Sequence, residues 1–177
     1  MNGSRAPRLA LLLLLAAAAP VAAQSLASSA LKGLDTKAPI NVDADRIDVL
    51  DQDNQAIFAG NVRVTQATMT LDANRIRVSY TRPAKGDPVI RRLDADGNVR
   101  LTTPSERATA RFGIYDVDQR LLSMVGDVVL IRGATRIAGN RLTIDLASGR
   151  STLDGRNATG EGGGRVSGRF EVPDRKK

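Results

Sequence analysis

The feature that most constrains the fold of this chain is an internal repeat of two alternating sequence patterns. One pattern, an arginine followed by an apolar, a variable and a second apolar residue, begins at Arg46, Arg75, Arg111 and Arg141. The other, a glycine, an asparagine or aspartate, a valine, a variable and an apolar residue, begins at Gly60, Gly97 and Gly126. A module of roughly 30 residues that recurs in this way predicts a stack in which neighbouring modules bury each other's apolar faces.

Apolar and other residues alternate with a period of two from Ala38 onward. This alternation is typical of strands with one buried face, and no window of helical length has the period of about 3.6 residues that a helix needs. The apolar phase predicts that the following side chains face the interior: Ile47, Val49, Phe58, Val62, Val64, Leu71, Ile76, Val78, Leu101, Phe112, Ile114, Leu130, Leu142 and Ile144.

The alternation changes parity at Asp45-Arg46, Asn74-Arg75 and Asn140-Arg141. A parity slip turns side chains to the other face of a sheet unless the strand bends there, so we expect corners at these positions. The predicted fold is all-β: an open-ended antiparallel β-jellyroll, or flattened solenoid, built from stacked two-strand modules with an apolar interior. The arginines of the first pattern are expected to bond turn carbonyls or carboxylates at the corners, or alternatively to form a phosphate-binding row.

Residues 1–23 are predicted to be a secretory signal peptide with cleavage before Gln24. Arg5 and Arg8 precede an unbroken apolar run from Leu9 to Ala19, and small residues follow at the expected cleavage site. This run is shorter than the roughly 20 apolar residues of a membrane-spanning helix, which favours cleavage over retention as an anchor.

The remaining chain divides into three parts by composition. Residues 24–37 are rich in serine and alanine and are expected to be a mostly disordered leader. Residues 38–159 contain the repeats and are expected to form the β-jellyroll, with an extended hairpin loop at Thr81–Pro88. Residues 160–177 are expected to form a glycine-rich linker, a possible edge strand at 165–172 and a basic tail.

Composition excludes several classes of function. The chain has no cysteine and no histidine, so it has no disulfide framework, no Cys/His zinc site and no Ser-His-Asp triad. Aromatic residues make up 3% of the chain, which argues against stacking platforms for nucleic acid. We expect no enzyme activity and no cofactor.

The net charge of +7 favours an anionic partner. The alternation turns five arginines outward, where they either bind phosphate or only confer solubility: Arg63, Arg77, Arg91, Arg92 and Arg100.

The segment from Asp94 to Asn98 begins like a calcium-binding loop. The bidentate glutamate that should complete such a loop would fall at position 105, which is a serine. We therefore expect a hairpin turn at this segment rather than a metal site.

The order and spacing of three segments resemble the OstA-like domain of the LptA family of periplasmic lipopolysaccharide transport proteins. The segments are Ala38–Ile47, Ala56–Gln66 and Leu71–Val78, and the similarity runs from about residue 38 to 150. The most specific part is Ala59-Gly60-Asn61-Val62 with Val64 and Gln66, followed by Leu71 and Ala73-Asn74.

The resemblance implies a periplasmic β-jellyroll that carries lipopolysaccharide between the two membranes of a Gram-negative cell. The acyl chains of lipid A are expected among the inward-facing residues named above, with the sugar chain outside. Copies are expected to join head to tail, with the N-terminal edge at Ile40–Val49 and the C-terminal edge within 165–172. An LptC-like inner-membrane protein is expected at the N-terminal edge and an LptD-like outer-membrane protein at the C-terminal edge, with no nucleic acid.

A second hypothesis remains open from the residues alone. An exported structural or adhesive β-solenoid would show the same alternation but would have a fully packed interior and no lipid ligand. Small inward residues such as Ala44, Ala59, Ala73 and Ala110 favour an interior with space for acyl chains.

Overall fold

The computed structural model describes residues 34–155 and 164–170, so the predicted signal peptide (1–23) and most of the predicted leader lie outside the described residues. The described part contains ten strands and one short 3-10 helix, η1 (Asp51–Asp53). The strands are β1 (Ile40–Asp43), β2 (Arg46–Leu50), β3 (Gln55–Gln66), β4 (Met69–Thr81), β5 (Val89–Thr102), β6 (Glu106–Asp116), β7 (Leu121–Arg132), β8 (Thr135–Asp145), β9 (Arg150–Asp154) and β10 (Ser167–Arg169). No helix among the described residues is long and apolar enough to cross a membrane.

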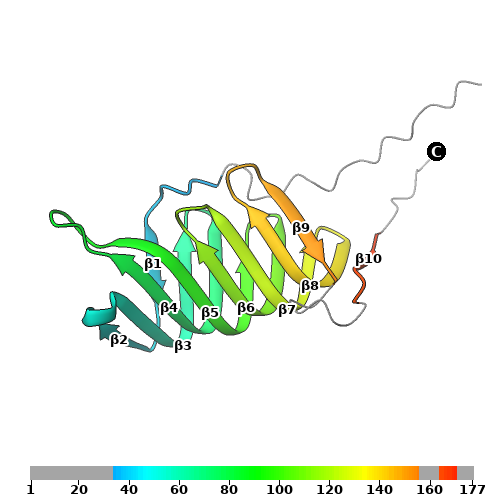
Figure 1. Cartoon of the computed structure of the whole chain (residues 1–177). Helices are drawn as coiled ribbons and strands as arrows, with labels where there is room; N and C mark the ends of the chain where they lie inside the picture. Colours follow the sequence, from blue (N-terminus) through cyan, green and yellow to red (C-terminus); the bar gives the residue numbers. More distant parts are fainter. Residues whose placement is uncertain (1–33, 156–163, 171–177) are drawn as a thin grey trace, which may run out of the picture.

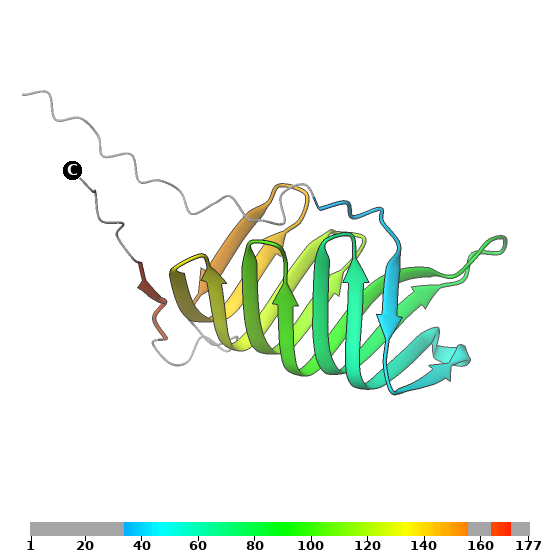
Figure 2. The same ribbon diagram turned by 180° about the vertical axis from the view of Figure 1, so that it is seen from behind.

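All ten strands belong to one antiparallel sheet, and the strands follow one another along the molecule in chain order (Figures 1 and 2). β1 and β2 both pair with β3 at one end, and β9 and β10 both pair with β8 at the other. The described strands do not close into a ring, so each end presents edge strands. The predicted open-ended, antiparallel all-β fold is confirmed.

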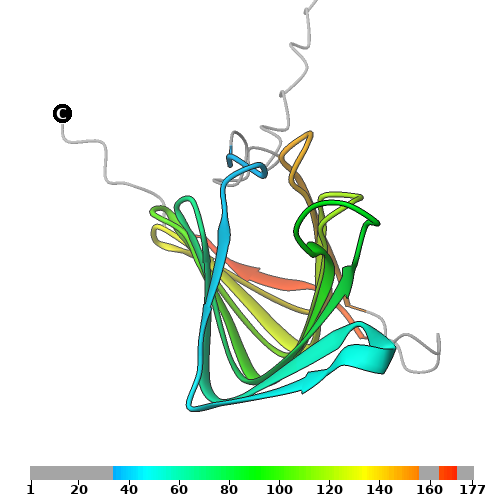
Figure 3. The same ribbon diagram turned by 90° about the vertical axis from the view of Figure 1, so that its left-hand side faces the viewer.

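Each central strand bends once, and the bends line up so that the sheet folds into two leaves that meet at a corner (Figure 3). The β2–β9 leaf consists of β2, β9 and the halves of β3 to β8 that pair between them. The β1–β10 leaf consists of β1, β10 and the other halves of the same strands. The inner faces of the two leaves enclose the apolar core.

A glycine followed by asparagine or aspartate produces the bend. Gly60-Asn61, Gly97-Asn98 and Gly126-Asp127 all have positive φ, between 46° and 86°. Glycine adopts this conformation without a steric penalty, and asparagine and aspartate tolerate it better than most residues. The pairing register shifts at each pair, so that two residues oppose one on the next strand. The predicted corners at Asn74 and Asn140 lie opposite these bulges on β4 and β8.

The prediction of a hairpin turn at Asp94–Asn98 is wrong, because this segment lies in the middle of β5. Gly97-Asn98 forms a corner bulge there, and a turn and a bulge favour the same residues because both need positive φ.

The predicted hairpin loop at Thr81–Pro88 joins β4 to β5 and projects beyond the sheet at the left of Figure 1. Arg82 fastens this arm to η1 by an ion pair with Asp51. The Arg82 guanidinium also lies 5.2 Å from the centre of the Tyr80 ring.

Candidate functional site

The interior between the two leaves is the candidate site, and most of the residues predicted to face inward do so. Their side chains are fully or nearly buried at Val62, Val64, Leu71, Ile76, Val78, Leu101, Leu130, Leu142 and Ile144, and Phe58 is partly buried against the same core. The strand registers place them in continuous rows across each leaf. One such row runs through Ile47, Phe58, Ile76, Ala95, Gly113, Met124, Leu142 and Leu153.

Ile47 and Val49 belong to the inner rows but are not buried. They pair with Phe58 and Ala56 and therefore share their face, yet they are 52% and 55% exposed. β2 is the last strand of its leaf, so no further strand among the described residues covers their outer side. The N-terminal end of the interior is thus apolar and open.

The prediction that Phe112 and Ile114 face inward is wrong. Phe112 is 48% exposed, whereas its neighbours Gly113 and Tyr115 are buried. The strand register pairs Arg75 with Asp96 and Asp96 with Phe112, so Phe112 lies on the outer face in line with Arg75. Arg111 therefore takes the place of the corner residue Asn74, which precedes Arg75. The sequence repeat was aligned on its arginines, which placed the copy that begins at Arg111 one residue out of register. A shift of one residue along a strand assigns each side chain to the opposite face of the sheet.

The structure adds inward residues that the repeat patterns did not single out. Leu93, Leu122, Met124 and Met69 are buried at 0% or 1% exposure. All four lie on the halves of their strands that contain neither of the two repeated sequence patterns. The alternation of apolar and polar residues was the only sequence feature that could have predicted their burial.

A hydrogen-bond chain joins the two leaves across the interior. The Tyr115 hydroxyl on the β2–β9 leaf donates to Gln66 Oε1 on the β1–β10 leaf at 2.8 Å. Gln66 Nε2 in turn donates to the carbonyl oxygens of Thr36 and Ala38, each at 3.1 Å. Burial raises the pKa of Tyr115, so the phenol stays protonated and remains a donor at neutral pH. These hydrogen bonds hold the segment before β1, at Thr36 and Ala38, over the core.

A cavity of about 400 Å³ opens between the leaves at the β8–β10 end of the interior. It is lined mainly by apolar side chains from both leaves and from the segment around β10: Leu130, Arg132, Thr135, Ile137, Leu142, Ser151, Leu153, Val166, Gly168 and Phe170. The middle of the interior, in contrast, is filled by buried side chains. The arrangement can therefore accept an apolar chain at this end without displacing the core.

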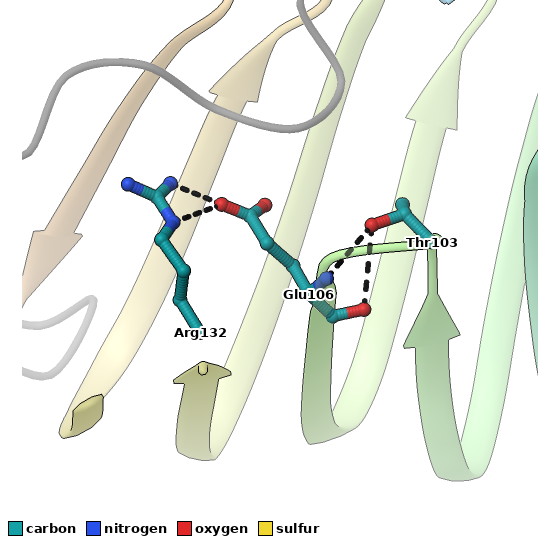
Figure 4. A network of polar contacts seen from close by, with 3 residues as sticks. All are labelled: Thr103, Glu106 and Arg132. Atoms are coloured by element: carbon teal, nitrogen blue, oxygen red, sulfur yellow. Dashed lines mark hydrogen bonds and ion pairs between the residues drawn. The ribbon is translucent and has the colours of Figure 1, made fainter. Parts of the chain in front are cut away.

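Among the described residues that line the cavity, Arg132 is the cationic one, and it belongs to a polar network (Figure 4). Arg132 forms an ion pair with Glu106, whose side chain is only 5% exposed. The Glu106 backbone N–H donates to the Thr103 hydroxyl oxygen at 3.1 Å, which fixes the turn between β5 and β6. A guanidinium held in this way places positive charge beside an apolar cavity.

The corner and surface arginines have mixed surroundings. The expected capping of corners by the arginines of the first pattern holds only for Arg111, which pairs with the corner residue Asp127 at 3.2 Å. Arg46 pairs at 2.7 Å with Asp48 on its own strand, and Arg75 and Arg141 form no ion pair within the described residues. Among the five surface arginines, three form ion pairs with Asp72, Asp118 and Asp94: Arg63, Arg91 and Arg92. In the described parts of the chain, no group of three or more acidic residues could hold a metal ion.

Comparison with known proteins identifies similar chains. The family described as LptA/(LptD N-terminal domain) LPS transport protein matches residues 41–150. An uncharacterized protein of Rhizobium meliloti (strain 1021) is 31% identical over 134 residues, which is 72% of this chain and 72% of that protein. The crystal structure of LptH from Pseudomonas aeruginosa, described as the LptA homologous periplasmic component of the lipopolysaccharide transport device, has a TM-score of 0.66. LptH is 18% identical, and the match covers 78% of this chain and 99% of that one.

Proposed function

Because the chain belongs to the LptA/LptD N-terminal-domain family of lipopolysaccharide transport proteins, we propose that its interior binds the acyl chains of lipid A. The family consists of transport proteins and not of enzymes, and its LptA members are periplasmic. The sugar chain of the ligand remains outside the two leaves. Residues 1–23 are the signal peptide that directs the chain to the periplasm.

The apolar cavity between the leaves at the β8–β10 end carries this proposal. Each acyl CH₂ group that moves from water into such a site contributes about 0.8 kcal/mol. The inner rows continue from the cavity through the buried core to Ile47 and Val49 at the other end, so one apolar path runs along the molecule. Acyl chains that advance beyond the cavity must separate the side chains that fill the middle of the interior.

The same packing supports the alternative of a structural β-solenoid without a lipid ligand. The interior residues Ile76, Leu93, Leu122 and Leu142 are all 0% exposed, as in a filled core. The two functions differ in whether lipid ever contacts these side chains.

Photo-crosslinking in living cells tests the proposal. A photoreactive amino acid at Leu142, which lines the cavity, is expected to crosslink to lipopolysaccharide. The same group at Thr143, the next residue on the outer face, is the matched control and is expected not to crosslink. Equal crosslinking at both positions would contradict binding confined to the interior. No crosslinking at Leu142 would favour the packed solenoid.

The two open ends are the proposed docking sites. β1 and β2 at the N-terminal end bind an LptC-like inner-membrane protein, and β9 with β10 at the C-terminal end binds an LptD-like outer-membrane protein. Between them, copies of the chain join head to tail, because unpaired backbone groups of an edge strand can pair with a further strand. This arrangement forms a bridge across the periplasm.

Proline at Val42 or Ile47 tests the N-terminal edge, because it removes a backbone N–H and disrupts local pairing. We expect the parent chain to form larger assemblies as its concentration rises, and each proline variant to remain smaller in light scattering. A parent chain that stays monomeric at high concentration and does not bind an LptC-like protein would contradict the docking proposal.

A further inference from the structure

The outer faces of the two leaves differ in charge. Along the paired strands, the outer face of the β2–β9 leaf carries six arginines and six aspartates, so its net charge is zero: Arg46, Arg75, Arg77, Arg92, Arg141 and Arg150 with Asp48, Asp94, Asp96, Asp116, Asp145 and Asp154. The outer face of the β1–β10 leaf carries five arginines and two aspartates, a net charge of +3: Arg63, Arg100, Arg107, Arg136 and Arg169 with Asp43 and Asp72. Solubility requires charge but not its concentration on one face.

Three of these five arginines line one depression of about 570 Å³ on the β1–β10 leaf. The depression spans β3 to β6 and is formed by Arg63, Arg100 and Arg107 with Thr65, Thr70, Thr102 and Asp72. By register, the three threonines and Arg107 form one row across the four strands. The row beside it contains Arg63, Asp72 and Arg100, so guanidinium groups border a strip of hydroxyl groups.

The single carboxylate of the depression is already neutralised. Asp72 accepts a hydrogen bond from Arg63 Nε at 2.8 Å. Neither Arg100 nor Arg107 has an ion pair or side-chain hydrogen bond within the described parts of the chain. The depression therefore keeps two unneutralised guanidinium groups on adjacent strands beside hydroxyl donors.

We propose that this depression is an oxyanion site that binds a phosphate group. A guanidinium fork donates two hydrogen bonds to a pair of oxygens, and a threonine hydroxyl can donate a third. The local charge of three arginines and one aspartate is +2, which matches a phosphate monoester. The site lies on the opposite side of the sheet from the core residues Leu71 and Leu101, so it is separate from the proposed lipid path.

Calorimetric titration of the mature chain with inorganic phosphate, at constant ionic strength, tests the site. A parallel titration uses vesicles of phosphatidic acid in phosphatidylcholine, which offer the same monoester group on a lipid headgroup. We expect Arg100→Gln with Arg107→Gln to weaken binding at least tenfold, because two charge-assisted contacts are lost. The probe that binds the parent identifies free phosphate or the headgroup as the source.

The matched control is Arg75→Gln with Arg77→Gln. These arginines line a depression of about 380 Å³ on the β2–β9 leaf that also contains Asp94 and Asp96, so its charge is balanced. The control is expected to bind as the parent does, and both double variants are expected to keep the parent's melting temperature because all four side chains are exposed. An equal loss in the two double variants, or no binding of either probe to the parent, would overturn the proposal.

Discussion

Tyr115 and Gln66 show how single side chains fix the separation of the two leaves. Their hydrogen bond is 2.8 Å long and lies among apolar side chains, with both residues 1% exposed. No buried side-chain nitrogen or oxygen in the described ranges lacks a partner. Removal of either group therefore leaves the other buried and unsatisfied, which costs more than an exposed hydrogen bond.

Tyr115→Phe is expected to lower the free energy of unfolding by about 1–2 kcal/mol, because Gln66 Oε1 loses its donor. Urea denaturation measures this change. Tyr80→Phe is the control, because the Tyr80 hydroxyl accepts its hydrogen bond from Arg82 at the surface. A loss for Tyr80→Phe as large as for Tyr115→Phe would contradict the role of the buried pair.

The raised pKa of Tyr115 also predicts a dependence of stability on alkaline pH. Because burial raises the folded-state pKa above that of the unfolded chain, the contribution is complete below the ordinary tyrosine pKa of about 10. It is lost as the pH rises from there through the folded-state pKa. Stability measured across this range should fall more steeply for the parent than for Tyr115→Phe. Parallel curves would show that the buried phenol does not contribute.

At the scale of the element, the corner between the two leaves explains which parts of the fold could be predicted from the sequence and which could not. The recurring Gly-Asn and Gly-Asp pairs and the parity slips are local, so strands, corners and most inward residues could be predicted. The third copy could not be aligned, because Arg111 sits at the corner where the other copies have Asn74 or Asn140. The cavity was also not predictable, since it depends on where β10 lies against β8.

Gly97→Ala is expected to destabilise the chain by about 1–3 kcal/mol. The residue has a φ of +76°, and an added Cβ would lie 2.6 Å from Asn74 Nδ2. Gly133→Ala isolates the cost of positive φ, because its φ is +54° and nothing lies within 4 Å of the added Cβ. In thermal unfolding, the melting temperature of Gly97→Ala should therefore be well below that of Gly133→Ala. Equal melting temperatures would mean that the corner tolerates a side chain.

At the scale of the whole molecule, the two ends are built alike but from different strands. At each end the terminal strand is split in two, one piece on each leaf: β1 with β2, and β9 with β10. The sequence predicted the N-terminal edge at Ile40–Val49, where β1 and β2 lie. At the other end, β10 falls within the range 165–172 but covers only one leaf, and β9 forms the edge of the other.

The proposed head-to-tail contact uses unlike surfaces, which predicts complementation between blocked variants. Ile47→Pro blocks one end and Thr152→Pro on β9 blocks the other. Each variant alone should remain monomeric, whereas an equimolar mixture should form dimers in analytical ultracentrifugation. Circular dichroism must first show that both variants keep the parent's strand content. Dimers of a single variant, or longer assemblies in the mixture, would contradict a contact between opposite ends.

The aligned bulges form one continuous corner along the molecule, because every central strand bends at the same register. Copies joined at their ends can continue this corner from one chain to the next. In the proposed bridge, the distance spanned is therefore set by the number of copies and grows in whole units of one chain. A gap between membranes that falls between two such units must be absorbed by tilt of the bridge or by its partners at the ends.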